Sequence, residues 1–233
     1  MNILMPMAGL GNRFANKGYT LPKPLIPVFN KSMIHTVIEN INLPGNYIFI
    51  IQKKHSQEFG LANHLKSIKP DCSIIEIDYE TQGAAITTLC AKDQINNDSP
   101  LIIANCDQII DWIPTHFIDW LKRKSPDGGI LNFLSVSNQH SYVTLDGSLV
   151  KTVVEKVAVS NIATVGIYYW KTGTSYVQNA ESMIERNLTV NNEFYIAPVY
   201  NHLVSNGGKV MVYPVFEYIN IGTPEALEQY KNG

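Results

Sequence analysis

The chain has 233 residues, 45% of them hydrophobic and 16% charged, with a formal net charge of −2 at pH 7. This composition predicts a globular protein with one large core, and its charge argues against a nucleic-acid or membrane-surface partner. Three cysteines without a Cys-x-x-Cys spacing predict reduced thiols and no zinc site. Met1 leads directly into an apolar run, and no run is long enough to cross a bilayer, so we expect a cytoplasmic protein without a signal peptide.

The first half alternates between short apolar runs and amphipathic segments. We expect strands at the Val/Ile/Leu-rich runs and helices where apolar residues recur every three to four positions. In chain order these are a strand at 2–7, a helix at 32–41, a strand at 47–52, a helix at 55–68, a strand at 73–78, a helix at 84–92 and a strand at 101–105. Apolar strands between helices predict a parallel sheet covered on both faces.

The second half is richer in strands. Strands are predicted at 129–136, 142–145, 149–154, 163–170 and 209–214, and helices at 174–187, 193–205 and 223–230. Asp146–Gly147 predicts a hairpin turn, Asn192 the cap of the second helix and Gly207–Gly208 its end. We therefore predict one Rossmann-like, three-layer α/β/α domain over 1–233, whose mixed central sheet is mainly parallel.

The first loop of functional interest follows the first strand and has the sequence MAGLGNRF. Gly9 and Gly11 allow a sharp turn with backbone N–H groups directed at a ligand. A Rossmann dinucleotide site is excluded because Phe14 occupies the position of its third glycine and no acidic residue follows at the expected distance. The P-loop pattern is absent. A turn without a ligand stays the alternative for an isolated Gly-x-Gly.

Two cations lie close to this loop in the sequence. Arg13 follows it directly, and Lys23 stands between Pro22 and Pro24, which stiffen its segment. Arginine binds phosphate oxygens in a fork and lysine acts as a point charge. The combination favours a triphosphate.

MAGLGNRF followed by LPKPLIPV resembles the signature of the sugar-phosphate nucleotidyltransferases, G-x-G-[ST]-R-[FL] and then K-P, with Asn12 in place of Ser or Thr. That family, of GT-A-like fold, joins a nucleoside triphosphate to a phosphorylated acceptor and releases pyrophosphate. The resemblance implies a nucleotide-binding half over about 1–110 and an acceptor half over about 111–233. It implies catalytic roles for Arg13 and Lys23, and nucleotide contacts from Ala8, Gly9, Leu10, Gly11 and Asn12.

Two further segments extend the resemblance on the nucleotide side. YETQGAAITTL resembles the family's second nucleotide loop, which implies base contacts from Gln82, Gly83 and Ala84; a plain helix start is the alternative. LIIANCDQII resembles its N-[GAS]-D motif and puts Asp107 just past a buried strand. Ligands of open α/β sheets bind at such strand ends, and the resemblance implies that Asp107 is catalytic and holds Mg²⁺. A loop acid or helix cap is the alternative.

Three segments of the second half resemble the family's acceptor side. VVEKVAV resembles its E-K-P segment, with Val157 for proline, and implies acceptor contacts from Glu155 and Lys156. NNEFYIAPVYN implies contacts from Glu193 and Asn192, although capping alone also explains Asn192. YINIGTPEAL resembles W-x-D-[IV]-G-T, whose aspartate is a second metal ligand. Asn220 stands there, and an amide oxygen binds Mg²⁺ less strongly than a carboxylate does.

The resemblance implies a Mg²⁺-dependent transfer from an NTP to a small phosphorylated acceptor, foremost a sugar 1-phosphate for capsule or surface-polysaccharide precursors. Short members also include cytidylyltransferases for acceptors such as phosphocholine. A metal-dependent glycosyltransferase is a further alternative, although its D-x-D motif would need an acid where Ile109 stands. A non-catalytic nucleotide sensor would explain Asn220. The base, the acceptor and the oligomeric state, a homo-oligomer included, stay open.

Overall fold

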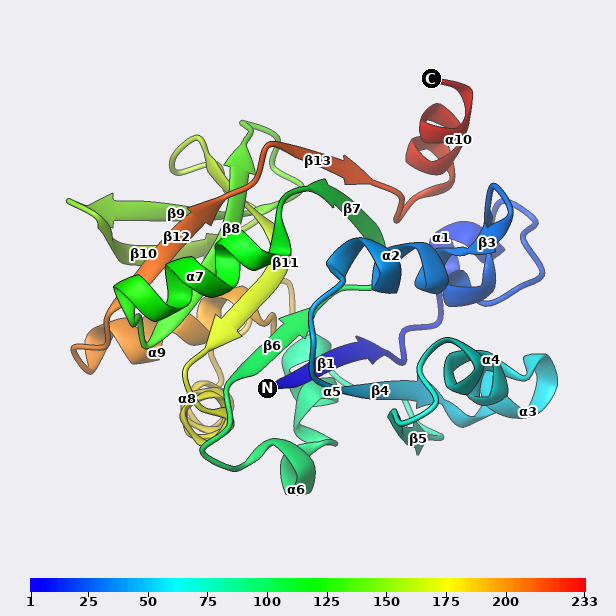
Figure 1. The fold of residues 1–233 in the computed structure, drawn as a ribbon, viewed down its shortest axis with the longest axis horizontal. Helices are drawn as coiled ribbons and strands as arrows, with labels where there is room; N and C mark the ends of the chain where they lie inside the picture. Colours follow the sequence, from blue (N-terminus) through cyan, green and yellow to red (C-terminus); the bar gives the residue numbers. More distant parts are fainter.

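The computed structural model describes residues 1–233 and contains a nine-stranded mixed sheet between two layers of helices (Figure 1). Seven strands follow the order β10-β9-β11-β6-β1-β4-β5; β8 also pairs with β11, and β12 pairs with β8. Their bounds are β1 Asn2–Met7, β4 Asn46–Gln52, β5 Ser73–Ile77, β6 Leu101–Ala104, β8 Gly128–Leu134, β9 Ser141–Asp146, β10 Leu149–Glu155, β11 Ile162–Trp170 and β12 Val210–Pro214. The predicted α/β/α fold is confirmed.

The two halves of the sheet differ in strand direction. β1 runs parallel to β4 and β6, and β4 runs parallel to β5. β11 is antiparallel to β6 and β8, and β9 and β10 form the predicted hairpin. Its Gly147 has φ +58°, the left-handed conformation that this turn requires. The parallel strands of the first half leave their carboxyl ends at one edge, where the glycine loop begins.

Helices cover both faces of the sheet. On one face lie α2 (Met33–Ile41), α4 (Leu61–Ile68), α7 (Pro114–Lys124) and α10 (Pro224–Asn232); on the other lie α5 (Ala84–Leu89), α6 (Lys92–Ile95), α8 (Gly173–Glu185) and α9 (Tyr200–Ser205). The two short helices α1 (Asn12–Ala15) and α3 (Lys53–Phe59) follow strands β1 and β4. None of these helices combines the length and apolar character that a membrane crossing requires.

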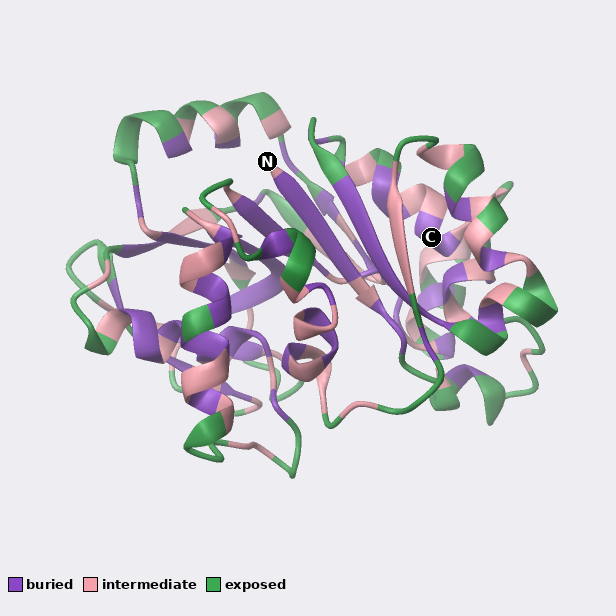
Figure 2. Ribbon diagram, turned by 90° about the horizontal axis from the view of Figure 1, so that it is seen from below, coloured by how far each residue is buried: buried purple, intermediate pink, exposed green.

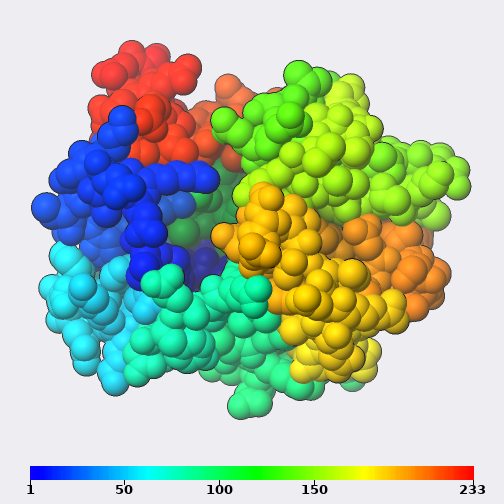
Figure 3. Space-filling view, turned by 180° about the vertical axis from the view of Figure 1, so that it is seen from behind, coloured from blue at the N-terminus to red at the C-terminus, as the bar shows by residue number.

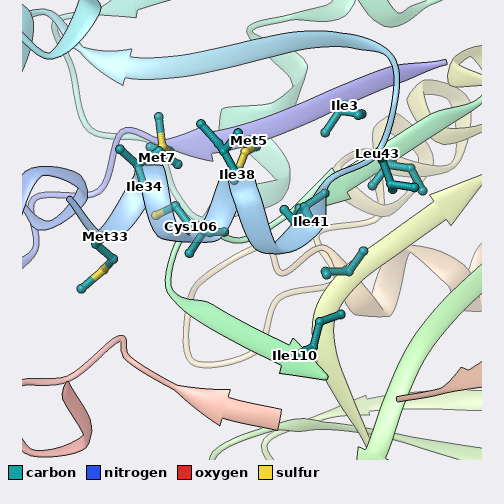
Figure 4. Close-up of a cluster of buried hydrophobic side chains, with 14 of the residues drawn as sticks. Ile3, Met5, Met7, Met33, Ile34, Ile38, Ile41, Leu43, Cys106 and Ile110 are labelled. Atoms are coloured by element: carbon teal, nitrogen blue, oxygen red, sulfur yellow. The ribbon is translucent and has the colours of Figure 1, made fainter. Parts of the chain in front are cut away.

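The core alternates across the sheet, as the strand period demands. Ile3, Met5 and Met7 of β1 pack under α2, whereas Leu4 faces the opposite helical layer (Figure 4). The central strands are buried almost throughout, and the helices expose only their outer faces (Figure 2). This packing fixes the strand ends from which the functional loops emerge.

Three predicted helices have different bounds in the structure. The segment 55–68 is divided at Gly60, whose φ of +69° ends α3 before α4 starts. The helix expected at 84–92 stops at Leu89. The helix expected at 193–205 is reduced to a 3-10 turn, η2 (Ala197–Val199), and α9. The helix expected at 223–230 is confirmed as α10, and Thr223 caps it, since the Thr223 hydroxyl accepts a hydrogen bond from the Ala226 N–H at 3.2 Å.

Apart from the short pair β2 (Pro27–Val28) and β3 (Lys31–Ser32), two features had not been predicted. The helix α7 is polar over most of its surface and buries only Phe117 and Leu121, which gives a weak periodic signal. A two-stranded ribbon pairs β7 (Gln108–Asp111) with β13 (Glu217–Asn220), and its register sets Asn220 opposite Gln108. The ribbon brings Asn220 to the strand end that holds Asp107.

Candidate active site

A cavity of about 670 Å³ opens between the two halves of the chain. In Figure 3 it is the hollow bounded by the N-terminal segment, the segment near residue 195 and the C-terminal ribbon. Its polar lining comes from segments distant in sequence: Arg13, Ala84, Asn105, Asp107, His140, Ser141, Glu155, Lys156, Tyr168, Glu193, Tyr195, Tyr218 and Asn220. A second cavity of about 270 Å³ lies against Gly9, Gly11 and Lys23 and shares Asn105 and Asp107 with the first. The two cavities therefore meet at Asp107.

The glycine loop presents unoccupied hydrogen-bond donors to this region. Gly11 has φ +70°, and a Cβ there would lie 3.3 Å from the Cβ of Lys23. This close approach packs the loop directly against the lysine. No protein acceptor takes the N–H groups of Gly9, Leu10, Gly11 or Asn12. Successive free N–H groups form a concave site for anionic oxygens.

Lys23 and Asp107 form an ion pair at the junction of the two cavities. The segment before Lys23 is extended at Pro22 (ψ 145°), and Pro24 is buried, so the lysine backbone is held firmly. Burial is the largest single influence and lowers the pKa of Lys23, but the Asp107 carboxylate and Cys106 together outweigh burial, and the pKa of Lys23 is raised. The amine stays protonated and can meet a negative oxygen entering from either cavity.

Asp107 and Asn220 are the two candidate metal ligands. A Cβ on Gly222 would lie 2.3 Å from Asp107 Oδ2 and 3.1 Å from Asn220 Oδ1, so both oxygens converge on this glycine. Asn220 Oδ1 also accepts the Gly222 N–H at 2.8 Å. Mg²⁺ is usually bound by one or two carboxylates together with substrate phosphates and water. The Asp107 carboxylate and the Asn220 amide oxygen are compatible with such a coordination.

The part of the large cavity that is lined by the second half of the chain holds a buried carboxylate. Glu155, at the end of β10, is 7% exposed and accepts a hydrogen bond from the Ser141 hydroxyl. Burial raises the pKa of Glu155, because the Ser141 hydrogen bond and the Lys156 charge only partly compensate the lost water. A carboxylate in this state gains from any further donor that enters the cavity.

Lys156 is held in an uncommon backbone conformation with φ +55°. Its Nζ donates to the Tyr195 hydroxyl at 2.5 Å and lies 4.6 Å from the centre of that ring. Such left-handed residues cluster at functional sites, where packing enforces them. The amine is thereby directed along the wall of the cavity beside Glu193, which also lines it.

The sequence pattern that defines the nucleotidyl transferases matches residues 2–229. The chain belongs to the nucleotidyl transferase family. Among curated relatives, a mannose-1-phosphate guanyltransferase of Schizosaccharomyces pombe is 26% identical over 179 residues (72% of this chain, 49% of that protein). One of Emericella nidulans is 27% identical over 139 residues (56% and 37%). This nucleotidyl transferase thus spans about half or less of the curated relatives it matches.

Solved structures share the fold. A nucleoside-diphosphate-sugar pyrophosphorylase from Vibrio cholerae superposes with a TM-score of 0.86 at 22% identity, over 99% of this chain and 100% of that one. A UDP-glucose pyrophosphorylase complexed with UDP-glucose gives 0.77 at 19% identity, over 99% and 97%. At these identities the likeness extends to the fold and its layered sheet.

The nucleotidyl transferase brings together seven of the residues singled out from sequence in the large cavity: Arg13, Ala84, Asp107, Glu155, Lys156, Glu193 and Asn220. Gly9, Gly11 and Lys23 line the smaller one. Ala8 is buried behind the loop, and Leu10, Asn12, Gln82, Gly83 and Asn192 line neither cavity. Contacts from these outlying residues stay predictions.

Asn192 does not cap a helix, so that prediction is wrong. Val190 and Glu193 exchange two backbone hydrogen bonds of 3.0 Å, and Asn191 and Asn192 between them have φ +50° and +61°. This is a two-residue turn of the I′ type, which asparagine tolerates well because its side chain suits left-handed backbone. The two consecutive asparagines between extended residues were the sequence signal that could have indicated this turn.

Several residues that line the cavities or support their walls had not been predicted. His140 and Tyr218 form an aromatic wall with Phe133, at ring distances of 5.5 Å (His140–Tyr218) and 4.3 Å (Phe133–Tyr218). Burial lowers the pKa of His140, so its ring is neutral near pH 7. Gln52, 6% exposed, ties the glycine loop to the next loop by donating to Ala8 O at 2.8 Å and Tyr79 O at 3.1 Å. A buried amide ending an apolar strand was its only sequence signal.

Proposed function

We propose that this chain is an NTP:sugar-1-phosphate nucleotidyltransferase that uses Mg²⁺. The observation that carries the proposal is the Lys23–Asp107 pair where the two cavities meet. One cavity offers free backbone N–H groups, which suit a triphosphate. The other offers a buried carboxylate and a lysine, which suit the hydroxyls and phosphate of a sugar 1-phosphate. The names of the curated relatives, mannose-1-phosphate guanyltransferases, agree with this division.

In the proposed reaction the acceptor's phosphate oxygen attacks the α-phosphorus of the NTP. The new O–P bond forms as the bond between the α-phosphorus and the bridging oxygen breaks, and pyrophosphate leaves with that oxygen. The nucleophile is already an anion, so no strong general base is required. The residues act by alignment and by stabilising charge.

Each residue has a distinct role in this proposal. The N–H groups of Gly9–Asn12 and the Arg13 side chain bind the departing phosphates, and Lys23 neutralises charge at the α-phosphate. Asp107 and Asn220 would hold Mg²⁺, which screens phosphate charge when bound. Glu155, Glu193 and Lys156 bind the acceptor. Residues of about 1–110 would thus serve the nucleotide, and those of about 111–233 the acceptor.

The test is a matrix of the common NTPs against phosphorylated acceptors, scored by pyrophosphate release. The acceptors are hexose 1-phosphates, heptose 1-phosphates and phosphocholine. Release with an NTP and a sugar 1-phosphate supports the proposal. Release with phosphocholine alone would favour the cytidylyltransferase alternative, and transfer from nucleotide sugars without NTP consumption would favour a glycosyltransferase.

A further inference from the structure

The second nucleotide loop is bound directly to the acceptor-side turn, although they are far apart in sequence. The Phe194 N–H donates to Gln82 O at 2.9 Å, and the Ala85 N–H donates to Phe194 O at 2.9 Å. The Gln82 side chain adds a third bond, from Nε2 to Asn192 O at 3.0 Å. The backbone of one residue, Phe194, is therefore bonded to both sides of the Gln82–Ala85 segment.

Gly83 allows this contact. Its φ of +106° belongs to the region that favours glycine. A Cβ there would lie 2.6 Å from both the backbone N and the backbone O of Phe194, closer than non-bonded atoms approach. Because the clash would be with backbone, no side-chain rotation could relieve it. Any larger residue would separate the two loops.

The turn that carries Phe194 is itself rigid. The paired hydrogen bonds of Val190 and Glu193 close it, and the Phe194 side chain is 4% exposed within the hydrophobic cluster beneath. Glu193 precedes Phe194 and lines the large cavity. A displacement of the Gln82–Ala85 segment would therefore move Phe194 through these hydrogen bonds. It would also move Glu193, because Glu193 directly precedes Phe194 in the chain.

We propose that Phe194 is a positioning residue that couples the two substrate subsites. NTP bound at the Gln82–Ala84 loop sets the position of the turn and with it that of Glu193, so the acceptor binds more tightly. Coupling free energies are reciprocal, so the acceptor strengthens NTP binding by the same factor, for which about 5- to 150-fold is typical. This inference rests on the proposed function, because it assigns the two loops to the two substrates.

The coupling is tested by measuring the dissociation constant of the sugar 1-phosphate with and without the α,β-methylene analogue of the NTP that turns over. We expect a ratio of at least about 5 for the wild type and a ratio near one for Gly83→Ala. Gly60→Ala is the matched control: it also introduces Ala at a positive φ, +69°, but nothing lies within 4 Å of its Cβ. Its ratio should equal that of the wild type.

Gln82→Ala provides a second variant in case Gly83→Ala does not fold. Gln82 is exposed, and within the protein the substitution removes one side-chain hydrogen bond, that to Asn192 O. Its ratio should fall between the wild-type value and one. Local damage to the nucleotide site would weaken the analogue but leave the ratio unchanged.

Amide hydrogen exchange gives a readout independent of the acceptor. The analogue alone should slow exchange across Val190–Ile196 in the wild type and in Gly60→Ala, but not in Gly83→Ala. If the wild type releases no pyrophosphate with any pair of substrates, the proposed function is wrong. If it turns over but its ratio is near one, or the ratio is unchanged in both loop variants, only the coupling is overturned.

Discussion

The two sides of the cavity, which we propose for the nucleotide and for the acceptor, differ in how their charged groups are held. On the nucleotide side, Lys23 is paired with Asp107 and the loop N–H groups are free. On the proposed acceptor side, Glu155 is buried and accepts a hydrogen bond from the Ser141 hydroxyl, and Lys156 donates a hydrogen bond to the Tyr195 hydroxyl. The first arrangement suits a polyanion whose charge changes during the reaction. The second suits hydroxyl groups and one phosphate that only need to be held.

Removing the central pair should have the largest effect. We expect Lys23→Ala and Asp107→Ala each to lower kcat/KM for the NTP by about 10³-fold, the upper range for losing a group that stabilises the transition state. Because the two act as a unit, the double variant should be little worse than either single one. Steady-state pyrophosphate release measures this.

The matched control is Lys17→Ala. Lys17 is also ion-paired, with Glu225 at 3.1 Å, but its side chain is 60% exposed and lies outside both cavities. Its kcat/KM should stay within twofold of the wild type. If the fold-loss of kcat/KM in the double variant equalled the product of the losses in Lys23→Ala and Asp107→Ala, the pair would not act as one unit.

Gly222→Ala sharpens the comparison without removing a charge. Its Cβ would lie 2.3 Å from Asp107 Oδ2 and force that carboxylate to move. Misplacing a reacting group by about 1 Å can cost roughly 100-fold, so kcat should fall about 10- to 100-fold. The KM for the acceptor should change little, because Glu155 and Lys156 are untouched. A rise in that KM with unchanged kcat would contradict the assignment of Asp107 to the reacting phosphates.

Lys156→Gln should affect only the acceptor side. Losing a charge-assisted hydrogen bond costs about 1.5–3 kcal/mol, so the KM for the sugar 1-phosphate should rise roughly tenfold or more. The KM for the NTP at saturating acceptor should not change. Lys151→Gln is the control, because Lys151 is an exposed lysine on β10, the strand that directly precedes Lys156. An equal rise in the KM for the NTP and the KM for the sugar 1-phosphate would contradict the assignment of Lys156 to the acceptor side.

Glu155→Gln should have the smallest effect of these substitutions. We expect it to stabilise the fold, whereas most substitutions of buried residues destabilise it. Burial raises the pKa of Glu155, so its protonated form is favoured in the folded state, and the wild type loses stability as pH rises through that raised value. Removing the charge should raise Tm at pH 7 by roughly 2–4 °C, the shift that about 1 kcal/mol produces at this chain length, while acceptor binding weakens.

Thermal unfolding between pH 4 and pH 8 measures this effect. The wild type should lose Tm relative to Glu155→Gln as the pH increases, and the two should converge in acid. Glu185→Gln, on the exposed end of α8, should follow the wild type. A lower Tm for Glu155→Gln at pH 7 would show that the buried carboxylate stabilises the fold.

The parallel half of the fold was predictable because its strands are rich in consecutive apolar residues, with β5 interrupted by Glu76. β1 has the predicted bounds, and Asp107 follows its strand as expected. The ribbon β7–β13 was not predictable, because four-residue strands gain their hydrogen bonds only from a partner about a hundred residues away. The sequence of either four-residue segment by itself does not indicate that pairing.

The site divides in the same way. Lys23 and Asp107 were predictable from a stiff proline segment and a strand end, which are local features. Gln52 and the contact of Gly83 with Phe194 depend on how loops meet in three dimensions. Asn192 was misassigned because asparagine favours both helix caps and I′ turns, and only the partner of Val190 distinguishes the two.

The most direct test follows the oxygens of the acceptor. The wild type is incubated with NTP and a sugar 1-phosphate whose phosphate oxygens are all ¹⁸O, and the products are weighed by mass spectrometry. Attack on the α-phosphorus predicts a nucleotide sugar that keeps all four labelled oxygens and pyrophosphate that contains none. Labelled pyrophosphate, or a nucleotide sugar that has lost label, would contradict the proposed reaction.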